Sequence, residues 1–305
     1  MGSERDSAPS IAQLMQNSSR FPTVLRIGMG MHLRDRRESA GLTQQQAGRF
    51  LGLSASVISR IEGGDCDRML DPDEVVTLLQ KYGQHDRGVL QQARHLALQA
   101  NQPGWYHRFG ALTPAFQTVF YDLEAAATQV RTYEPQHMPG LLQTPEYASA
   151  QTWGALSDAA REENENRIAL RVMRGALLTE KQPPMQYWAV MDESIFYRKV
   201  GYSSVLAAQF KHLLEISEQP KVTLQVFPRD ELLPGQVGAM TILRVPVPAM
   251  PDIVYLERID EAEYIQGAEE GEPHRKMFDW LAAQALTPEK SRDVFRQFYE
   301  THRRA

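Results

Sequence analysis

The sequence predicts an α+β protein in which an all-helical N-terminal domain of five helices precedes a mixed α/β domain with a helical lead-in. Residues 28–100 show short apolar patterns of helical period that end in glycines. The turn sequence NQPG at 101–104 interrupts this pattern. After residue 184, short β-branched and aromatic runs appear, as expected for strands. We therefore expect a flexible arm over residues 1–20, a first domain over 21–102 and a second domain over 103–305.

The composition is that of a globular protein. A length of 305 residues suits about two domains, because one hydrophobic core rarely grows larger. No apolar run approaches the ~18 residues of a membrane span, and the polar first twenty residues do not resemble a signal peptide. Cys66 is the single cysteine, which excludes an intrachain disulfide and fits a reducing compartment. We therefore expect a cytoplasmic protein with no membrane partner.

The net charge of −5 hides an uneven distribution along the chain. Residues 26–60 contain 6 Lys or Arg and 2 Asp or Glu, whereas residues 101–305 contain 21 basic and 27 acidic residues. Affinity for DNA depends on local neutralisation of phosphates, so a basic patch matters more than the total charge. The distribution permits DNA binding by the first domain and argues against it for the second.

The five helices of the first domain are each bounded by recognisable signals. Glycines at 41, 52, 63–64 and 83 end four of them, and capping residues precede the later ones. Asp71 followed by Pro72, for example, is a typical helix start. The expected helices cover residues 28–39, 44–51, 55–62, 72–82 and 86–100.

The second and third of these helices form a tight angled pair. Thr43 and Gln46 have capping-box spacing at the start of the second helix, and Gly52-Leu53-Ser54 is the turn between the two. Gly52 permits a positive φ there, and we expect Ala47 to be small where the helices cross. The apolar faces expected to point inward are Ala47, Phe50 and Leu51 on one helix and Val57, Ile58 and Ile61 on the other.

The segment LRDRRESAGLTQQQAGRFLGLSASVISRIEGGD resembles the helix-turn-helix of the phage-repressor-like (Xre) transcription regulators over about sixty residues. The resemblance implies binding of double-stranded operator DNA, with Gln44 clamping a phosphate. It places in the DNA groove Ser54, Ala55, Ser56, Ser59 and Arg60. It also implies a structural ion pair between Arg37 and Glu62. We add Arg34, from the arginine-rich first helix, as a further DNA contact.

This chain departs from the family pattern at the first groove positions. Ala55 and Ser56 stand where operator-reading members often carry Gln, Arg or Asn, so only Arg60 can make a bidentate contact with guanine. One such helix gives little affinity. We therefore expect a homodimer whose recognition helices lie about 34 Å apart, one turn of DNA.

The second domain combines helices with short strands. A strand–helix–strand unit is expected over residues 185–227, with a helix at 203–218. The further expected helices are 116–130, 158–178, 272–285 and 288–303, and the expected strands are 185–190, 222–227, 240–245 and 253–256. The turn at Pro139–Thr144 is interpreted as a corner that defines the fold.

The segment YDLEAAATQVRTYEPQHMPGLLQTPEYASA opens a stretch of about 185 residues that resembles a domain of unknown function following Xre helix-turn-helices in many bacterial regulators. Members are described as antitoxin-like and are often encoded beside a very small partner protein. The resemblance therefore implies a small protein encoded nearby as a partner. At Gly175 this chain lacks a glutamine that the family usually has after an arginine.

Signatures of catalysis are missing from the sequence. It contains no phosphate-binding loop, no nucleophile elbow and no HExxH motif, and its eight histidines are scattered. Glu193 and Glu257 can face each other from strand ends, but carboxylates at such positions are more often solvated or cap helices than form a catalytic pair. We expect no enzyme activity, no catalytic residues, no metal and no cofactor. Three hypotheses remain: a DNA-binding regulator, an antitoxin-like neutraliser of a small protein, and a regulator gated by a small-molecule effector.

Overall fold

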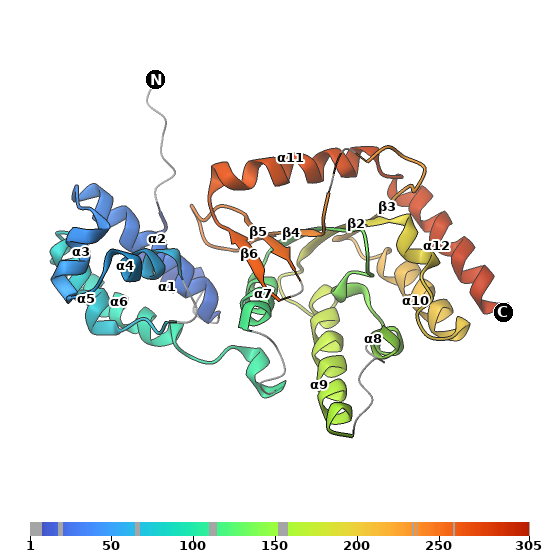
Figure 1. Ribbon diagram of the computed structural model, residues 1–305, viewed down its shortest axis with the longest axis horizontal. Coiled ribbons are helices and arrows are strands. Elements are labelled where there is room, and N and C mark those ends of the chain that lie inside the picture. Colours follow the sequence, from blue (N-terminus) through green and yellow to red (C-terminus); the bar gives the residue numbers. More distant parts are fainter. Residues whose placement is uncertain are drawn as a thin grey trace. The chain divides into compact units, whose positions relative to one another are not determined.

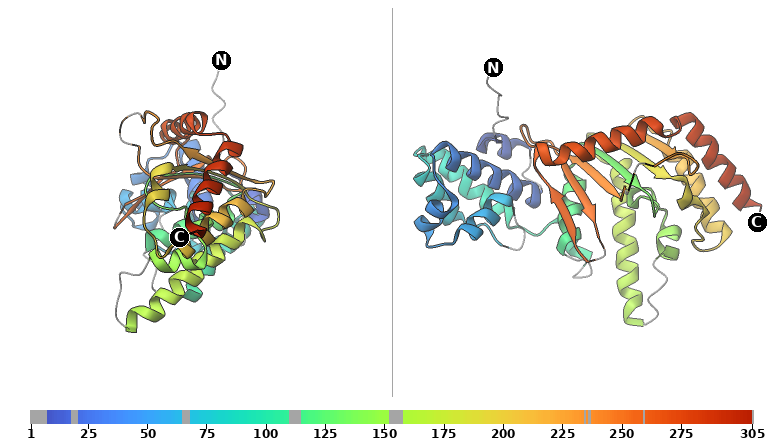
Figure 2. Two further views of the ribbon diagram at one scale, coloured as in Figure 1. Left: turned by 90° about the vertical axis from the view of Figure 1, so that its right-hand side faces the viewer. Right: turned by 45° about the horizontal axis from the view of Figure 1, so that its top comes forward.

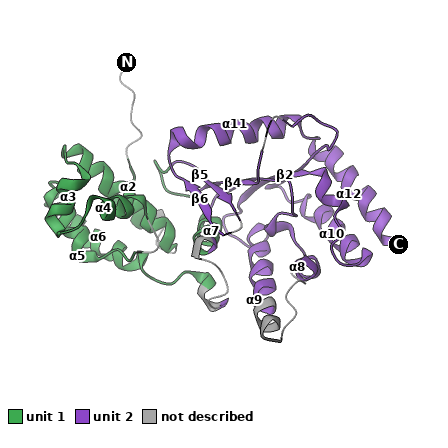
Figure 3. Cartoon of the chain, viewed as in Figure 1, with its two compact units in different colours: residues 1–107, 118–126, 245–250 green, residues 108–117, 127–244, 251–305 purple. Residues whose placement is uncertain are grey.

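The structure, a computed structural model, describes residues 8–17, 21–64, 68–109, 115–151, 158–233, 235, 237–258 and 260–304 (Figure 1). Two compact units are distinguished by their internal contacts (Figure 3). The first unit contains residues 1–107, 118–126 and 245–250, and the second contains 108–117, 127–244 and 251–305. The first is helical and the second contains a mixed sheet, so the predicted α+β class is confirmed. Cys66 lies outside the described residues.

The first unit is built around a long central helix. Leu25, Met29 and Leu33 recur at intervals of four residues along it and are at most 1% exposed. Glycines with positive φ follow several helices, including Gly41, Gly52 and Gly64. The helices are α1 (Ile11–Asn17), α2 (Pro22–Ser39), α3 (Gln44–Leu51), α4 (Ala55–Gly63), α5 (Pro72–Lys81) and α6 (Arg87–Ala100).

The flexible arm expected over residues 1–20 contains an ordered helix. Residues 11–17 form α1, and both Ile11 and Leu14 are buried. Leu14 occupies the space that a side chain at Gly28 would need, because a Cβ there would lie 2.3 Å from Leu14 Cδ2. The spacing of Ile11 and Leu14 gives one apolar face to a single turn of helix. That signal is too short to stand out in the sequence.

A hydrogen bond from far along the chain caps the start of α2. Thr23 N donates to Asp122 Oδ2 at 2.7 Å, and Asp122 lies on α7 (Ala115–Ala126). The preceding residue, Phe21, provides no side-chain cap. Burial raises the pKa of Asp122 to about 6, and the Thr23 hydrogen bonds partly oppose that rise. Asp122 therefore supplies the N-terminal cap of a helix that begins 100 residues earlier in the chain.

Six strands of the described residues form one sheet in the order β3-β2-β1-β4-β5-β6. The strands β1, β2 and β3 are parallel to one another, and the pairs β1–β4, β4–β5 and β5–β6 are antiparallel. The strands are β1 (Gln129–Glu134), β2 (Gln186–Asp192), β3 (Val222–Phe227), β4 (Met240–Arg244), β5 (Ile253–Glu257) and β6 (Ala262–Ile265).

The sheet contains two strands that the sequence did not indicate. Residues 129–134 were expected at or beyond the end of a helix over 116–130, but that helix ends at Ala126 and β1 follows at once. No proline or glycine separates the two elements, so the sequence carries no local sign of the change. Strand β6 has four residues and lacks a continuous apolar run. The other four strands lie within two residues of their expected bounds.

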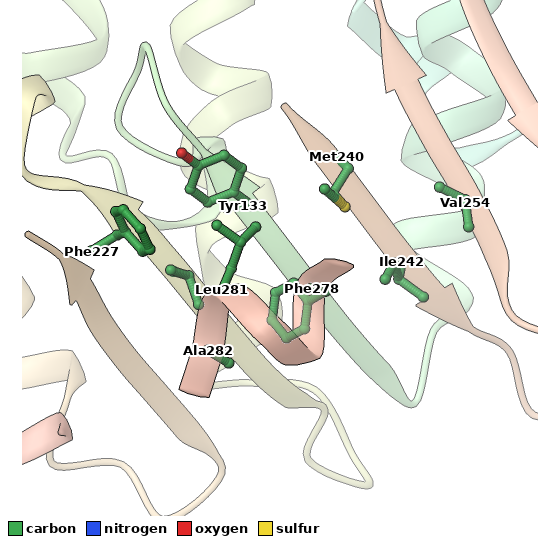
Figure 4. Packing of buried hydrophobic residues seen from close by; sticks show 9 residues of the cluster. Tyr133, Phe227, Met240, Ile242, Val254, Phe278, Leu281 and Ala282 are labelled. Carbon is green, nitrogen blue, oxygen red and sulfur yellow. The ribbon is translucent and has the colours of Figure 1, made fainter. Parts of the chain in front are cut away.

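The helix α11 (Ala268–Gln284) packs along one face of the sheet (Figure 2). Phe278, Leu281 and Ala282 of this helix contact a row of buried strand residues (Figure 4). That row consists of Tyr133, Val190, Phe227, Met240, Ile242 and Val254. Beside β3, the helices α10 (Ser203–Ile216) and α12 (Pro288–Arg303) pack against each other. The last two helices are therefore part of the core of the second unit.

The helices α8 (Pro145–Gln151) and α9 (Asp158–Gly175) stand between β1 and β2 in the chain, opposite α11 in Figure 1. The turn before α8 is tied to α10 by one buried side chain. Gln209 Oε1 accepts from Thr144 N at 2.9 Å, and Gln209 Nε2 donates to Leu142 O at 2.7 Å. Short 3-10 helices complete the described structure at Trp105–Phe109, Gly140–Leu142, Ala176–Leu178 and Glu193–Tyr197.

Candidate DNA-binding site

The helices α3 and α4 are joined by a turn that brings backbone against backbone. Gly52 has φ of 67°, a conformation that favours glycine. The closest approach is at Gly48, where a Cβ would lie 2.3 Å from the carbonyl oxygen of Leu53. The sequence reasoning assigned the small residue at the crossing to Ala47, which is buried, but it missed Gly48. The close approach of the two backbones therefore requires glycine at residue 48.

Side-chain caps fix where both helices begin. Thr43 Oγ1 accepts from Gln46 N, and Gln46 Oε1 accepts from Thr43 N, so the predicted capping box is present. Ser54 Oγ accepts from Val57 N at 3.4 Å at the start of α4. These caps satisfy amide groups that have no partner inside their own helix.

The Glu62 carboxylate connects three helices of the first unit. It is 2% exposed and accepts from Arg37 Nε at 2.6 Å and Arg37 Nη2 at 2.9 Å. Gln44 Nε2, at the start of α3, donates to the same carboxylate at 3.0 Å. Arg34 Nε lies 3.9 Å away. The hydrogen bond to Glu62 raises the pKa of Arg37, so this buried guanidinium stays charged.

The outward face of α4 is polar and available. Ser56, Ser59 and Arg60 are exposed, Ala55 is half-buried, and Arg60 is the single cation of the helix. Ser54 Oγ and Ser56 Oγ lie 2.8 Å apart and form a hydrogen bond. This face can therefore present hydroxyl groups and one guanidinium to a DNA groove, and both groups can contact base edges.

The structure separates the predicted DNA contacts into two groups. Ser54, Ala55, Ser56, Ser59 and Arg60 lie along the first turns and outer side of α4. Gln44 and Arg34 gather instead at the Glu62 carboxylate. The inward orientation expected for Phe50 is wrong: its side chain is 38% exposed.

Phe50 packs on a neighbouring charge rather than in the core. Lys81 Nζ of α5 lies 5.7 Å from the centre of the Phe50 ring. A cation over an aromatic face is a favourable surface contact. The apolar pattern of α3 predicted that Phe50 lies on the buried face. Neighbouring helix positions differ by about 100° around the axis, so a residue at the edge of that face is easily placed on the wrong side.

Two family models match this chain. The model described as a helix-turn-helix domain matches residues 29–91, which contain the α3–α4 corner. The model described as a domain of unknown function (DUF5753) matches residues 117–297, more than half of the chain. The chain belongs to the DUF5753 family. The searches of curated proteins and of solved structures found no match.

The two matches confirm the coarser predictions. This DUF5753 protein carries a helix-turn-helix domain of the DNA-binding type, followed by a domain of unknown function. None of the described helices combines the length and apolar character that a membrane crossing requires. Within the described ranges, no three His, Cys, Asp or Glu side chains are grouped so that they could hold a metal ion.

The second unit places two carboxylates at one end of its sheet. Glu134 ends β1 and Glu257 ends β5, on either side of β4. Thr132 of β1, Thr241 of β4 and Tyr255 of β5 lie opposite one another. Side chains two positions apart on a strand point to the same face, so Glu134 lies on the face of Thr132 and Glu257 on the face of Tyr255, which is the same face of the sheet. Burial raises the pKa of Glu134 to about 8, the Glu257 charge adds to the rise, and Arg174 opposes it.

Glu193, which was considered opposite Glu257, has other partners. Its carboxylate accepts from Tyr197 Oη at 3.0 Å and from Arg229 N at 3.3 Å. Glu257 Oε1 accepts from Gln117 Nε2 at 2.9 Å. The carboxylate that shares a sheet face and a sheet end with Glu257 is therefore Glu134, on a strand that was not expected from the sequence.

Proposed function

We propose that this DUF5753 protein is a sequence-specific, cytoplasmic transcription regulator of the Xre type, without enzyme activity, which places α4 in the major groove of operator DNA. The observation that carries the proposal is the exposed polar face of α4 on a rigid corner. The buried Glu62 carboxylate holds α2, α3 and α4 together through Arg37 and Gln44. A recognition helix needs such a fixed base if its side chains are to find base edges.

In this proposal, Arg60 reads a base and the neighbouring serines contact bases or phosphates. Arg60 is the only α4 side chain able to make two parallel hydrogen bonds to guanine. Arg34 is half exposed and lies at the same corner, so it supplies charge for phosphates. Because one helix makes few base contacts, the protein binds as a homodimer to two half-sites.

The proposal is tested by selecting a preferred duplex from a random pool with the full chain and measuring binding by fluorescence anisotropy. Arg60→Ala should weaken binding to the preferred duplex by about 1–3 kcal/mol and relax selection at one base position in each half-site. Arg87→Ala, at an exposed arginine on α6, is the matched control and should change neither. Equal binding to all duplexes before and after Arg60→Ala would exclude base recognition by this helix.

The second unit, in the same proposal, binds a small protein or ligand and so changes the population of dimers able to bind DNA. An antitoxin-like role, with DNA binding mainly for autoregulation, is the alternative. Exposed apolar side chains on the second unit favour a protein partner: Tyr202 and Leu232 are each 81% exposed, and Tyr197 is 53% exposed. Co-expression with the product of a small neighbouring gene tests this alternative, because a neutraliser must form a stable complex that survives gel filtration.

A further inference from the structure

A network of polar side chains joins the turn before α8 to α9 in the second unit. Arg171 Nη1 donates to Gln143 Oε1 at 2.9 Å and to Gln151 Oε1 at 3.1 Å. Gln143 Nε2 donates to Met138 O at 2.8 Å and also contacts Gln151 Oε1. Gln151 Nε2 lies 3.2 Å from His137 Nδ1. The two glutamines thus fix the positions of one guanidinium and one imidazole.

Two further polar groups belong to α8 and to the segment that packs on it, and neither has a hydrogen-bond partner among the described residues. The first is the Tyr147 hydroxyl, whose residue is 3% exposed. The second is the Arg198 guanidinium, which is exposed and pairs with no carboxylate in the described part of the chain. The segment after Arg198 packs on α8, since a Cβ at Gly201 would lie 3.0 Å from Ala150 Cβ.

The charges of both arginines affect the pKa values of His137 and Tyr147. Burial lowers the pKa of His137, and the charges of Arg198 and then Arg171 lower it further. Burial raises the pKa of Tyr147, and the same two arginines oppose the rise. Among the described residues, the carboxylate with an effect on His137 is Glu257, and its effect is the smallest of the four. Among the described residues, the charges that affect these two groups most are therefore positive.

We propose that Arg171, Arg198, His137 and Tyr147 form a binding site for a small molecule that carries an oxyanion, a phosphate or a carboxylate group. Arginine presents paired donors that match both kinds of oxyanion, and the Tyr147 hydroxyl, which has no partner among the described residues, can donate a further hydrogen bond. The inference rests on the proposed function in one respect: in a DNA-binding regulator, such a ligand is the effector that the second unit senses.

The test is isothermal titration of the full-length protein with inorganic phosphate and, separately, with succinate, at constant ionic strength and with chloride as the reference anion. Arg198→Gln is the main variant, because its guanidinium has no structural partner to lose. Tyr147→Phe removes only a hydroxyl. Lys199→Gln removes the same charge at the adjacent exposed position and is the matched control.

We expect saturable binding of at least one of the two anions. Arg198→Gln should weaken it at least tenfold, and Tyr147→Phe should weaken it several-fold, both order-of-magnitude expectations for lost hydrogen bonds to a charged group. Lys199→Gln should leave it unchanged. Stronger binding of phosphate than of succinate, or the reverse, identifies the oxyanion.

Three results would overturn the site. The first is no saturable binding of either anion, and the second is an equal loss in Arg198→Gln and Lys199→Gln. The third is a loss of affinity for the preferred duplex in Arg198→Gln without added anion, because the arginine would then serve DNA phosphates. The titration uses no DNA, so a failure of the proposed DNA binding leaves its result intact, and a failed titration leaves the duplex measurements intact.

Discussion

The two units each contain a glutamate withdrawn from water, and the two glutamates have opposite surroundings. Glu62 in the first unit is 2% exposed and accepts hydrogen bonds from Arg37 and Gln44. Glu134 in the second unit is partly buried, and its carboxyl group has no hydrogen-bond partner among the described residues. The charges that affect its pKa are the like charge of Glu257 and the opposite charge of Arg174.

This difference decides what each carboxyl group can do. A carboxylate with a bidentate arginine and an amide donor joins the helices that contribute those donors. A carboxyl group that loses hydration and gains a negative neighbour retains its proton near neutral pH. The first is suited to holding a DNA-reading corner in shape. The second is suited to changing its charge within the physiological range.

Removal of the cation beside Glu62 should have the largest effect. Arg37→Met leaves a buried carboxylate without its ion-pair partner, which typically costs about 3–5 kcal/mol. Hydrogen exchange measured by mass spectrometry on the full chain should show protection lost across α2, α3 and α4. Arg36→Met, the same substitution at an exposed neighbour, is the control. If the two variants lose protection equally, Glu62 does not depend on Arg37.

Glu134→Gln should stabilise the protein, in contrast to the change beside Glu62. The pKa of Glu134 rises from 4.5 to about 8 on folding, so the unfolded chain releases this proton first and wild-type stability falls between pH 4.5 and about 8. Replacing the group with a neutral amide removes that loss. The gain should be small at pH 5 and about 1–3 kcal/mol at pH 8, since Glu134 is only partly buried.

Urea unfolding at both pH values measures this gain, with Glu263→Gln as the control because Glu263 is exposed on β6. A Glu134→Gln variant that is as stable as the wild type at pH 8 would mean that Glu134 ionises as easily in the folded chain as in the unfolded one. A variant that is less stable at both pH values would mean that the carboxylate makes a favourable contact.

The two units also differ in how well the sequence predicted their structure. The helix-turn-helix was predictable because its signals are local: caps at Thr43 and Ser54, a glycine at residue 52 and apolar residues at helical spacing. Gly48 was missed because its requirement comes from the carbonyl of Leu53 across the turn, which no spacing rule encodes. Local patterns therefore predict elements better than contacts between them.

The pair of carboxylates in the second unit, Glu134 and Glu257, was also missed because it depends on contacts between distant elements. Glu134 and Glu257 are 123 positions apart, and only the register of β1, β4 and β5 brings them to one end of one face. Since β1 itself was not expected, no argument from the sequence could place Glu134 at a strand end. The cluster around Arg171 and Tyr147 likewise depends on how α8 and α9 pack.

Gln44→Met tests the weaker of the two attachments to Glu62. The variant loses one hydrogen bond to a carboxylate that keeps both bonds to Arg37, so we expect a cost of about 1 kcal/mol. Gln45→Met, at an exposed neighbour, is the control for stability in thermal unfolding. A loss of DNA affinity much larger than 1 kcal/mol would indicate that Gln44 leaves Glu62 and binds a phosphate in the complex, as the family resemblance implies.

Arg34→Gln should have the smallest effect on stability and a separate effect on DNA. Its guanidinium is half exposed and lies 3.9 Å from Glu62, so the substitution should change the free energy of unfolding by less than about 0.5 kcal/mol. If Arg34 neutralises one phosphate per subunit, the slope of log affinity against log salt should fall by about 0.9 for each subunit bound. Anisotropy titrations over a range of salt concentrations measure that slope for the wild type, Arg34→Gln and Arg87→Gln. An unchanged slope together with a clear loss of stability would place Arg34 with Arg37 as a structural partner of Glu62 and remove it from the DNA-binding surface.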